Sequence, residues 1–310
     1  MTGLRASPPA PWLRSSEWVL GGYFVYVAVA AHALGVRPSV PLVITALNAA
    51  VLAGLLLLAW ADGFRRTRFL GIVRDWYPYP LMLLGYREMG WFAAPRDRFP
   101  LEEAWVVWDR VLLNDWGLKA AIEILGPVIP SILEISYSLV YAIVPFCMAV
   151  LYLCRRREQV DAFLFIFLAG IFSAYTLFPY FPSEPPRTAF PGQDFPTHIT
   201  VFREFNWWFL GGYGIHTSVF PSAHVSGAFS AAFAVRTLLP EQRWAGRLLL
   251  ALAVLIATAT LYGRYHYAVD ALAGFAVSLA AWGAGMLVER GRRGGRPPAR
   301  EAGPPPTSPL

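Results

Sequence analysis

Residues 40–61 read VPLVITALNAAVLAGLLLLAWA, 22 consecutive residues that carry no charge. A membrane-spanning helix needs about 20 mostly apolar residues, so this stretch predicts one. The rest of the chain agrees, because 56% of its 310 residues are hydrophobic, only 15% are charged, and the mean hydropathy is +0.45. A soluble domain with an ordinary surface is less apolar than this. The chain is therefore predicted to fold in a lipid bilayer.

Seven further apolar runs join this one, so the sequence predicts an all-α, polytopic transmembrane bundle of about eight spans. The predicted spans cover residues 18–36, 40–61, 76–94, 132–154, 160–180, 222–239, 248–263 and 266–288. Arg87 and Glu88 place two charges inside the third run, where each must pair or reach the interface. Cys147 and Cys154 share one apolar run, and we interpret them as lipid-facing or core residues rather than as a disulfide or metal site.

The predicted spans divide the chain into four parts. Residues 1–94 are expected to form N-terminal transmembrane helices, residues 132–289 the catalytic transmembrane core, and residues 290–310 a disordered cytoplasmic tail. Residues 95–131 form an extracytoplasmic segment between them. Within it, residues 101–125 have the pattern of an amphipathic helix lying at the outer interface, with tryptophans at headgroup level. A soluble cap packed on the bundle is the alternative.

The direction of the spans follows from the arginines, which cluster at residues 5–14, 65–68, 155–157, 236–247 and 290–296. Short cytoplasmic loops are enriched in Lys and Arg, and these clusters share one side if the third run crosses. Both termini are then cytoplasmic. We expect an integral protein of a bacterial inner membrane, with its active site on the periplasmic side. The alternative is that the first apolar run belongs to a signal peptide, but this run is longer than the apolar region of a signal peptide usually is.

The basic charge of the chain has no pattern that fits nucleic acid. The net charge is +6 and the pI is near 9.5, but the arginines lie at the ends of apolar runs, without an aromatic-interleaved basic stripe. Membrane lipids are the expected partners, and a nucleic acid is not.

Three polar segments fall on the same predicted side of the membrane: FPSEPPR at residues 181–187, FPSAH at residues 220–224 and YGRYHYAVD at residues 262–270. In the last one, His266 and Asp270 are four residues apart, so on a helix they share one face. A carboxylate that holds one ring nitrogen leaves the other aimed and unprotonated, as a nucleophilic imidazole requires. The alternative is a structural His–Asp pair that ties two helices together.

The second segment has the signals of a helix start, with Ser222 as the candidate N-cap after a proline. The free N–H groups and the positive dipole end of a helix stabilise an anion, so Ser222 and Ala223 are candidate phosphate-binding residues. His224 is then placed to protonate a leaving alkoxide as general acid. An ordinary capped helix with an interfacial histidine is the alternative.

Arg187 and Arg264 are the candidate phosphate clamps of these segments. A guanidinium group binds phosphate oxygens in a bidentate manner and keeps its charge throughout a reaction. For Arg187, an arginine that snorkels to lipid headgroups is the alternative.

With these residues assembled, the chain resembles the type-2 phosphatidic acid phosphatase superfamily, and within it the branch related to inositol phosphorylceramide synthases. The resemblance covers about the last half of the chain. The superfamily combines a basic motif, a Pro-Ser-Gly-His motif and a Ser-Arg motif followed by His-x-x-x-Asp. It implies a metal-independent reaction without a cofactor, with His266 as nucleophile that forms a phosphohistidine, Asp270 as its partner, His224 in the second motif and Arg187 as the clamp.

The chain departs from the family pattern at three positions. Tyr180 stands where the first motif usually has Lys, Thr260 where the third usually has Arg, and Ala223 where the second has Gly. Arg264 is the expected substitute for a missing cation. The Tyr-His-Tyr surroundings of His266 and the segment RDWYP at residues 74–78 resemble the synthase branch, so an alcohol acceptor such as inositol stays open beside water.

Three hypotheses follow from these residues. The first is a phosphatase or phosphotransferase acting on a lipid phosphate. The second is a zinc-dependent membrane hydrolase in which His224, His266 and Asp270 are ligands, although the neighbouring arginines would repel a cation. The third is a non-catalytic lipid-binding membrane protein with a degraded site.

Overall fold

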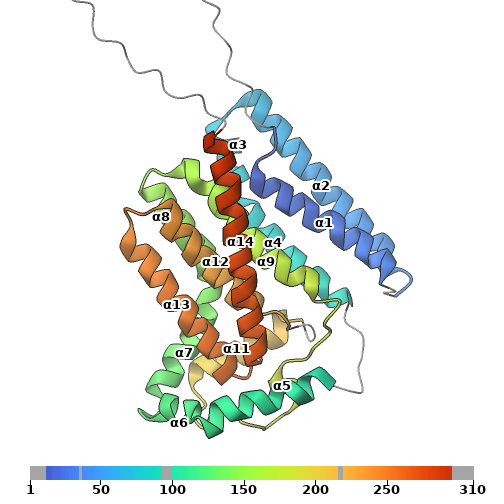
Figure 1. Ribbon diagram of the computed structural model, residues 1–310. Helices are drawn as coiled ribbons and strands as arrows, with labels where there is room; N and C mark the ends of the chain where they lie inside the picture. The colour runs from blue at the N-terminus through green and yellow to red at the C-terminus, as the bar shows by residue number, and fades with distance from the viewer. Residues whose placement is uncertain (1–11, 35–36, 93–99, 216–218, 295–310) are drawn as a thin grey trace, which may run out of the picture.

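The computed structural model describes residues 12–34, 37–92, 100–215 and 219–294, which fold into a bundle of helices (Figure 1). The predicted all-α class is confirmed, because these residues contain no β-strand. The helices are α1 (Ser15–Ala33), α2 (Val40–Arg65), α3 (Arg68–Trp76), α4 (Pro78–Met89), α5 (Pro100–Arg110), α6 (Leu118–Glu123), α7 (Val128–Ser138), α8 (Ile143–Leu153), α9 (Val160–Leu177), α10 (Pro186–Ala189), α11 (Val201–Tyr213), α12 (Ala223–Leu238), α13 (Arg243–Tyr262) and α14 (Ala268–Gly294). Most of the predicted tail, residues 295–310, lies outside the described residues.

Five helical stretches of the described chain are long and apolar enough to cross a membrane, which indicates an integral membrane protein. They are Val40–Arg65, Val128–Leu153, Arg157–Leu177, Arg243–Tyr262 and Ala268–Arg292. The count of eight spans is not confirmed. The first, third and sixth predicted spans fold into α1, α4 and α12, of which α4 has 12 residues and α12 has 16. Both are shorter than the roughly 20 residues that a span needs.

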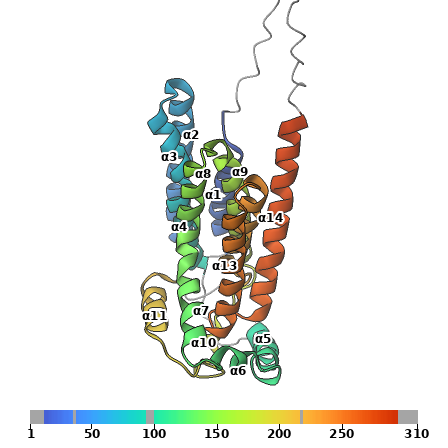
Figure 2. The same ribbon diagram turned by 90° about the vertical axis from the view of Figure 1, so that its left-hand side faces the viewer.

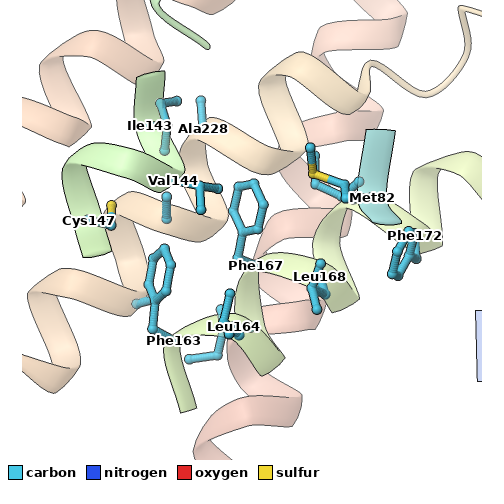
Figure 3. Packing of buried hydrophobic residues seen from close by; sticks show 14 of the residues in the cluster. Met82, Ile143, Val144, Cys147, Phe163, Leu164, Phe167, Leu168, Phe172 and Ala228 are labelled. Carbon is cyan, nitrogen blue, oxygen red and sulfur yellow. The ribbon is translucent and has the colours of Figure 1, made fainter. Parts of the chain in front are cut away.

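Helices α9 and α12 form the centre of the bundle, where they pack against each other and against α14. Small residues of α12 allow this close approach. The hydroxyl of Ser226 donates to the carbonyl of Gly170 at 2.9 Å, and a Cβ on Gly227 would lie 2.5 Å from the Ile171 side chain. Figure 3 shows the core beside this contact, where phenylalanines and leucines of α9 lie against Met82, Val144 and Cys147. Cys147 is buried in this core, Cys154 is partly exposed, and both are free cysteines.

A group of ion pairs joins several helices at one end of the bundle. Arg14 and Arg157 both bind Asp75 at 2.6 Å, and Arg292 binds Asp161 at 2.6 Å. These contacts join the beginnings of α1 and α9 to α3 and to the end of α14, at the top of Figure 1. The opposite end carries α5, α6, α10 and α11 (Figure 2). The bundle therefore has an arginine-rich end and, opposite to it, an end built from short helices.

Residues 101–125 form two helices and not the single amphipathic helix that the sequence predicts. A π-helical turn, Val111–Asp115, ends α5, and Gly117, whose φ is 72°, separates it from α6. The ring of Trp105 packs on the bundle, with its centroid 5.5 Å from that of Tyr267, whereas Trp116 is 75% exposed. One face of the segment thus caps the bundle, and the other leaves aromatic side chains uncovered.

Candidate active site

His266 lies in the turn between α13 and α14, two residues before α14 begins. Its Nδ1 is 3.3 Å from Oδ2 of Asp270, and the backbone N–H of Tyr267 donates to the same oxygen at 2.9 Å. The spacing of four residues does bring the two groups together, but across the start of a helix rather than along its face as predicted. Asp270 orients the imidazole and also ties down the first turn of α14.

The other ring nitrogen of His266 faces His224. Its Nε2 is 3.4 Å from Nδ1 of His224, and the two ring centroids are 5.5 Å apart. His224 lies in the first turn of α12, which Ser222 caps by accepting the N–H of Val225 at 3.3 Å. The N–H of Ser222 donates to the backbone carbonyl of Asp270 at 2.9 Å, so the starts of α12 and α14 are bonded directly to each other.

His266 is buried and lies outside the five spanning stretches. Burial, and after it the positive charge of Arg187, lowers the pKa of the His266 imidazole to about 3. The ring is therefore neutral at neutral pH. An imidazole attacks an electrophile only in this form, since the attacking nitrogen must be unprotonated.

Arg187 approaches the two histidines from α10. Its backbone N–H donates to the carbonyl of Arg264 at 3.2 Å, and its guanidinium carbon lies 5.5 Å from the centroid of the Tyr265 ring. Its side chain has no hydrogen bond or ion pair to any residue that the structure describes. The guanidinium donors are therefore available to a ligand.

The sequence predicts Arg264 at the phosphate site, but its side chain does not reach the site. Its φ is 60°, its side chain is fully buried, and it binds Oδ2 of Asp109 in α5 at 2.6 Å. The other carboxylate oxygen of Asp109 accepts the N–H of Ala268 at 2.8 Å. The left-handed backbone turns the side chain toward α5, where a carboxylate neutralises it. The structure thus brings His224, His266 and Arg187 together and places Arg264 behind them, in an ion pair.

A cavity of about 90 Å³ opens beside these residues. Arg187, His224, Tyr265 and His266 line its polar end, with Ala223 next to them, whereas Ser222 is buried behind the lining. The rest of the wall is apolar or aromatic and comes mainly from α4, α7, α8 and α9. A mostly apolar wall with a few convergent polar groups is the usual lining of a small-molecule site.

A family model described as the PAP2 superfamily matches residues 104–284, which is more than half of the chain. The chain belongs to the PAP2 superfamily. No significant match is found among the curated proteins or among the solved structures. The superfamily generally includes phosphatases and phosphotransferases, so membership and the apolar helices together indicate a phosphatase-like membrane protein.

The residues that match the PAP2 superfamily model also form a buried polar network, which was not predicted from the sequence. Glu134 of α7 binds Arg203 at 2.8 Å, accepts the side-chain amide of Asn206 at 2.7 Å and accepts the hydroxyl of Tyr265 at 2.6 Å. Arg203 in turn donates to the carbonyl of Gly263 at 3.0 Å. The available signal was Glu134 itself, because a carboxylate inside a predicted span is costly and is usually paired for a reason.

In this PAP2 superfamily chain, Asp270, His266 and His224 follow one another in a row. Asp270 contacts one nitrogen of His266, and His224 contacts the other, so one imidazole stands between the two remaining groups. In a metal site, by contrast, the three ligands would surround the ion at a common centre. Among the residues that the structure describes, no group of three His, Cys, Asp or Glu side chains is placed to hold a metal ion.

Proposed function

We propose that this protein transfers the phosphoryl group of a lipid phosphate through a phosphohistidine at His266. The observation that carries the proposal is the position of one imidazole, which Asp270 holds at Nδ1 while Nε2 faces His224 at the polar end of the cavity. A neutral imidazole oriented by a carboxylate has the form of an activated nucleophile. A purely structural histidine does not need a cavity at its second nitrogen.

In the first step, the lone pair of His266 Nε2 attacks phosphorus, and the bond from phosphorus to the lipid oxygen breaks. The anionic substrate favours the protonated form of His224 beside it, and His224 then passes this proton to the leaving oxygen. In the second step, water attacks the phosphohistidine and gives inorganic phosphate, with neutral His224 accepting its proton. An alcohol in place of water gives a new phosphate ester.

Arg187 and the start of α12 stabilise the charge on the phosphoryl oxygens in this proposal. The Arg187 side chain carries no competing ion pair in the described chain, and guanidinium groups bind phosphate oxygens in pairs. The backbone N–H groups near Ala223 lie at the positive end of the α12 dipole. Preorganised donors of this kind are usually a large part of catalysis.

The apolar wall of the cavity favours a substrate with a hydrocarbon chain, which is why we propose a lipid phosphate. We also propose that the site faces the periplasm of a bacterial inner membrane, because it lies opposite the arginine-rich end. The acceptor is either water or a headgroup alcohol such as inositol, as in the synthase branch of the family.

The test is a release assay on purified protein with a panel of lipid phosphates, with and without inositol or glycerol. We expect free phosphate or a new phosphate ester, and we expect His266→Ala to lower kcat at least about a thousandfold because the nucleophile is lost. The matched control is His198→Ala, since His198 lies in the separate segment between α10 and α11 and has no hydrogen bond with any described residue. Full activity of His266→Ala would contradict the proposal.

The same assay separates the two alternatives. Activity that EDTA removes and zinc restores would support a zinc hydrolase. Binding of lipid phosphates without any turnover by the wild-type protein would support a non-catalytic lipid-binding protein.

A further inference from the structure

Arg187 has an unusual environment for a residue that is to bind an anion. Its guanidinium has no hydrogen bond or ion pair within the described chain, and its side chain contacts the ring of Tyr265 at 5.5 Å. An aromatic ring attracts a cation through its quadrupole and occupies no N–H donor. The ring therefore orients the guanidinium group of Arg187, and the N–H donors of this group stay free for phosphate oxygens.

The Tyr265 ring is itself held at its far end. Its hydroxyl donates to Glu134 at 2.6 Å, and the side chain is 1% exposed. Glu134 is fixed in turn by the ion pair with Arg203 and by the amide of Asn206. Hydrogen bonds to an ionised acceptor are among the strong ones in proteins, so this ring has little freedom to move.

The same network also fixes the backbone that carries the ring. Arg203 is fully buried and donates to the carbonyl of Gly263, two residues before Tyr265 and three before His266. The turn that presents the proposed nucleophile and the ring that supports the proposed clamp therefore share one anchor.

A stack of rings extends this support to the proposed general acid. Tyr137 stacks on Tyr265 with the ring centroids 4.1 Å apart and the planes at 18°. The ring of His224 lies 5.0 Å from that of Tyr137 at 22°. Stacked rings of this kind have a preferred offset, so the position of one constrains the next. Tyr265 thus contacts the clamp Arg187 directly and the proposed acid His224 through Tyr137.

We propose that Tyr265 is a positioning residue, a platform fixed by Glu134 that holds Arg187 ready for phosphate and, through Tyr137, keeps His224 in register with His266. The inference rests on the proposed function for the roles of Arg187 and His224. It adds a requirement that phosphate affinity depends on the Tyr265 ring, which acts through Arg187 and Tyr137 and not as a phosphate ligand.

Tyr262 provides a matched control three residues away. Its hydroxyl also donates to a carboxylate, that of Glu123, at 3.0 Å, but its side chain does not line the cavity. Tyr265→Phe and Tyr262→Phe therefore each remove one tyrosine–carboxylate hydrogen bond near the same turn. Only the first loosens the platform.

The experiment measures inorganic phosphate affinity by calorimetry on the purified full chain, together with kcat and KM for a lipid phosphate. We expect Tyr265→Phe to weaken phosphate binding about threefold to tenfold, and Tyr265→Leu, which removes the ring, by more than tenfold. Tyr262→Phe should stay within about twofold of the wild type. In an Arg187→Ala background, Tyr265→Leu should weaken phosphate binding little further, because both changes remove the same interaction.

The inference is overturned if Tyr265→Leu binds phosphate like the wild type, if Tyr262→Phe weakens binding equally, or if the effects of Arg187→Ala and Tyr265→Leu simply add. Phosphate affinity is measured without turnover. A wild-type protein whose phosphate affinity depends on Arg187 and Tyr265 but that turns over no substrate would refute the proposed function and still support the platform.

Discussion

At the scale of single residues, the site depends on the protonation of His266. Asp270 accepts from the backbone of Tyr267 at 2.9 Å and lies 3.3 Å from the imidazole, so it selects the tautomer with the proton on Nδ1. Asp270→Asn keeps the shape but presents an amide in place of a carboxylate. We expect kcat to fall about a thousandfold or more while the melting temperature changes little. A steady-state assay with a thermal melt checks this, and an unchanged kcat would contradict the role of Asp270.

The pH dependence of stability follows from the low pKa of the same imidazole. The pKa is about 3 in the folded protein and near the ordinary 6.5 when unfolded. Below pH 6.5 the unfolded chain takes up a proton that the folded His266 does not, so stability is lost as the pH falls from 6.5 toward 3. Between pH 7 and pH 5 the loss from this residue is about 2 kcal/mol. Thermal melts should show a smaller decline for His266→Ala, and equal declines in both proteins would contradict the buried neutral state.

At the scale of helices, the site requires α12 and α14 to start side by side. Gly274 of α14 makes this possible, because a Cβ there would lie 2.4 Å from the backbone carbonyl oxygen of Ser222. A backbone atom of this kind cannot rotate away as a side chain would. Gly274→Ala is therefore expected to push the two helix starts apart and to separate His224 from His266.

The expected result is a loss of kcat/KM of about a hundredfold, since a displacement of about 1 Å at a catalytic site has that effect. Gly283→Ala is the control, because the same helix leaves open space around Gly283. Equal activity of the two variants would show that the close contact of α12 and α14 does not matter for the reaction.

The ion pair between Arg264 and Asp109 belongs to the same scale, because it fastens α5 to the turn before α14. Breaking a buried pair by removing one partner leaves an uncompensated charge and costs about 3–5 kcal/mol. We expect Arg264→Ala to lower stability by this amount, and the double variant Arg264→Met with Asp109→Leu to regain most of it. Denaturation in detergent measures both. A stable Arg264→Ala with weakened phosphate binding would instead support the phosphate-binding role predicted from the sequence.

At the scale of the whole molecule, the arginine-rich end and the site end are opposite each other. Exposed Gln193 lies at the site end, and exposed Glu241, which pairs with Arg156, lies at the other. In a chain without Cys147 and Cys154, a membrane-impermeant thiol reagent applied to intact spheroplasts should label Gln193→Cys and not Glu241→Cys. The reverse pattern would place the site in the cytoplasm and contradict the proposed orientation.

The sequence predicted the features that depend on local spacing. Four residues between His266 and Asp270, and a proline with Ser222 before His224, were sufficient to assign the His–Asp pair and the helix start. Hydropathy likewise predicted the runs that form α2, α9, α13 and α14.

Features that depend on pairing across distant segments were beyond such reasoning. Arg264 was expected at the phosphate because nothing local reveals that Asp109, 155 residues away, neutralises it. The anchor of Tyr265 is similarly remote, since Glu134 and Arg203 come from two other helices. A positive backbone φ at Arg264 is also not encoded by a pattern that hydropathy or spacing can detect.

The central claim is that His266 becomes covalently phosphorylated, and trapping this intermediate tests it most directly. The purified protein is mixed with a lipid phosphate radiolabelled in its phosphoryl group, quenched with base, and analysed by peptide mapping. We predict label that is stable to base and labile to acid on the peptide containing residue 266, and none in His266→Ala. Turnover of the substrate by the wild-type protein without any label on that peptide, at quench times within the first cycle, would contradict the account.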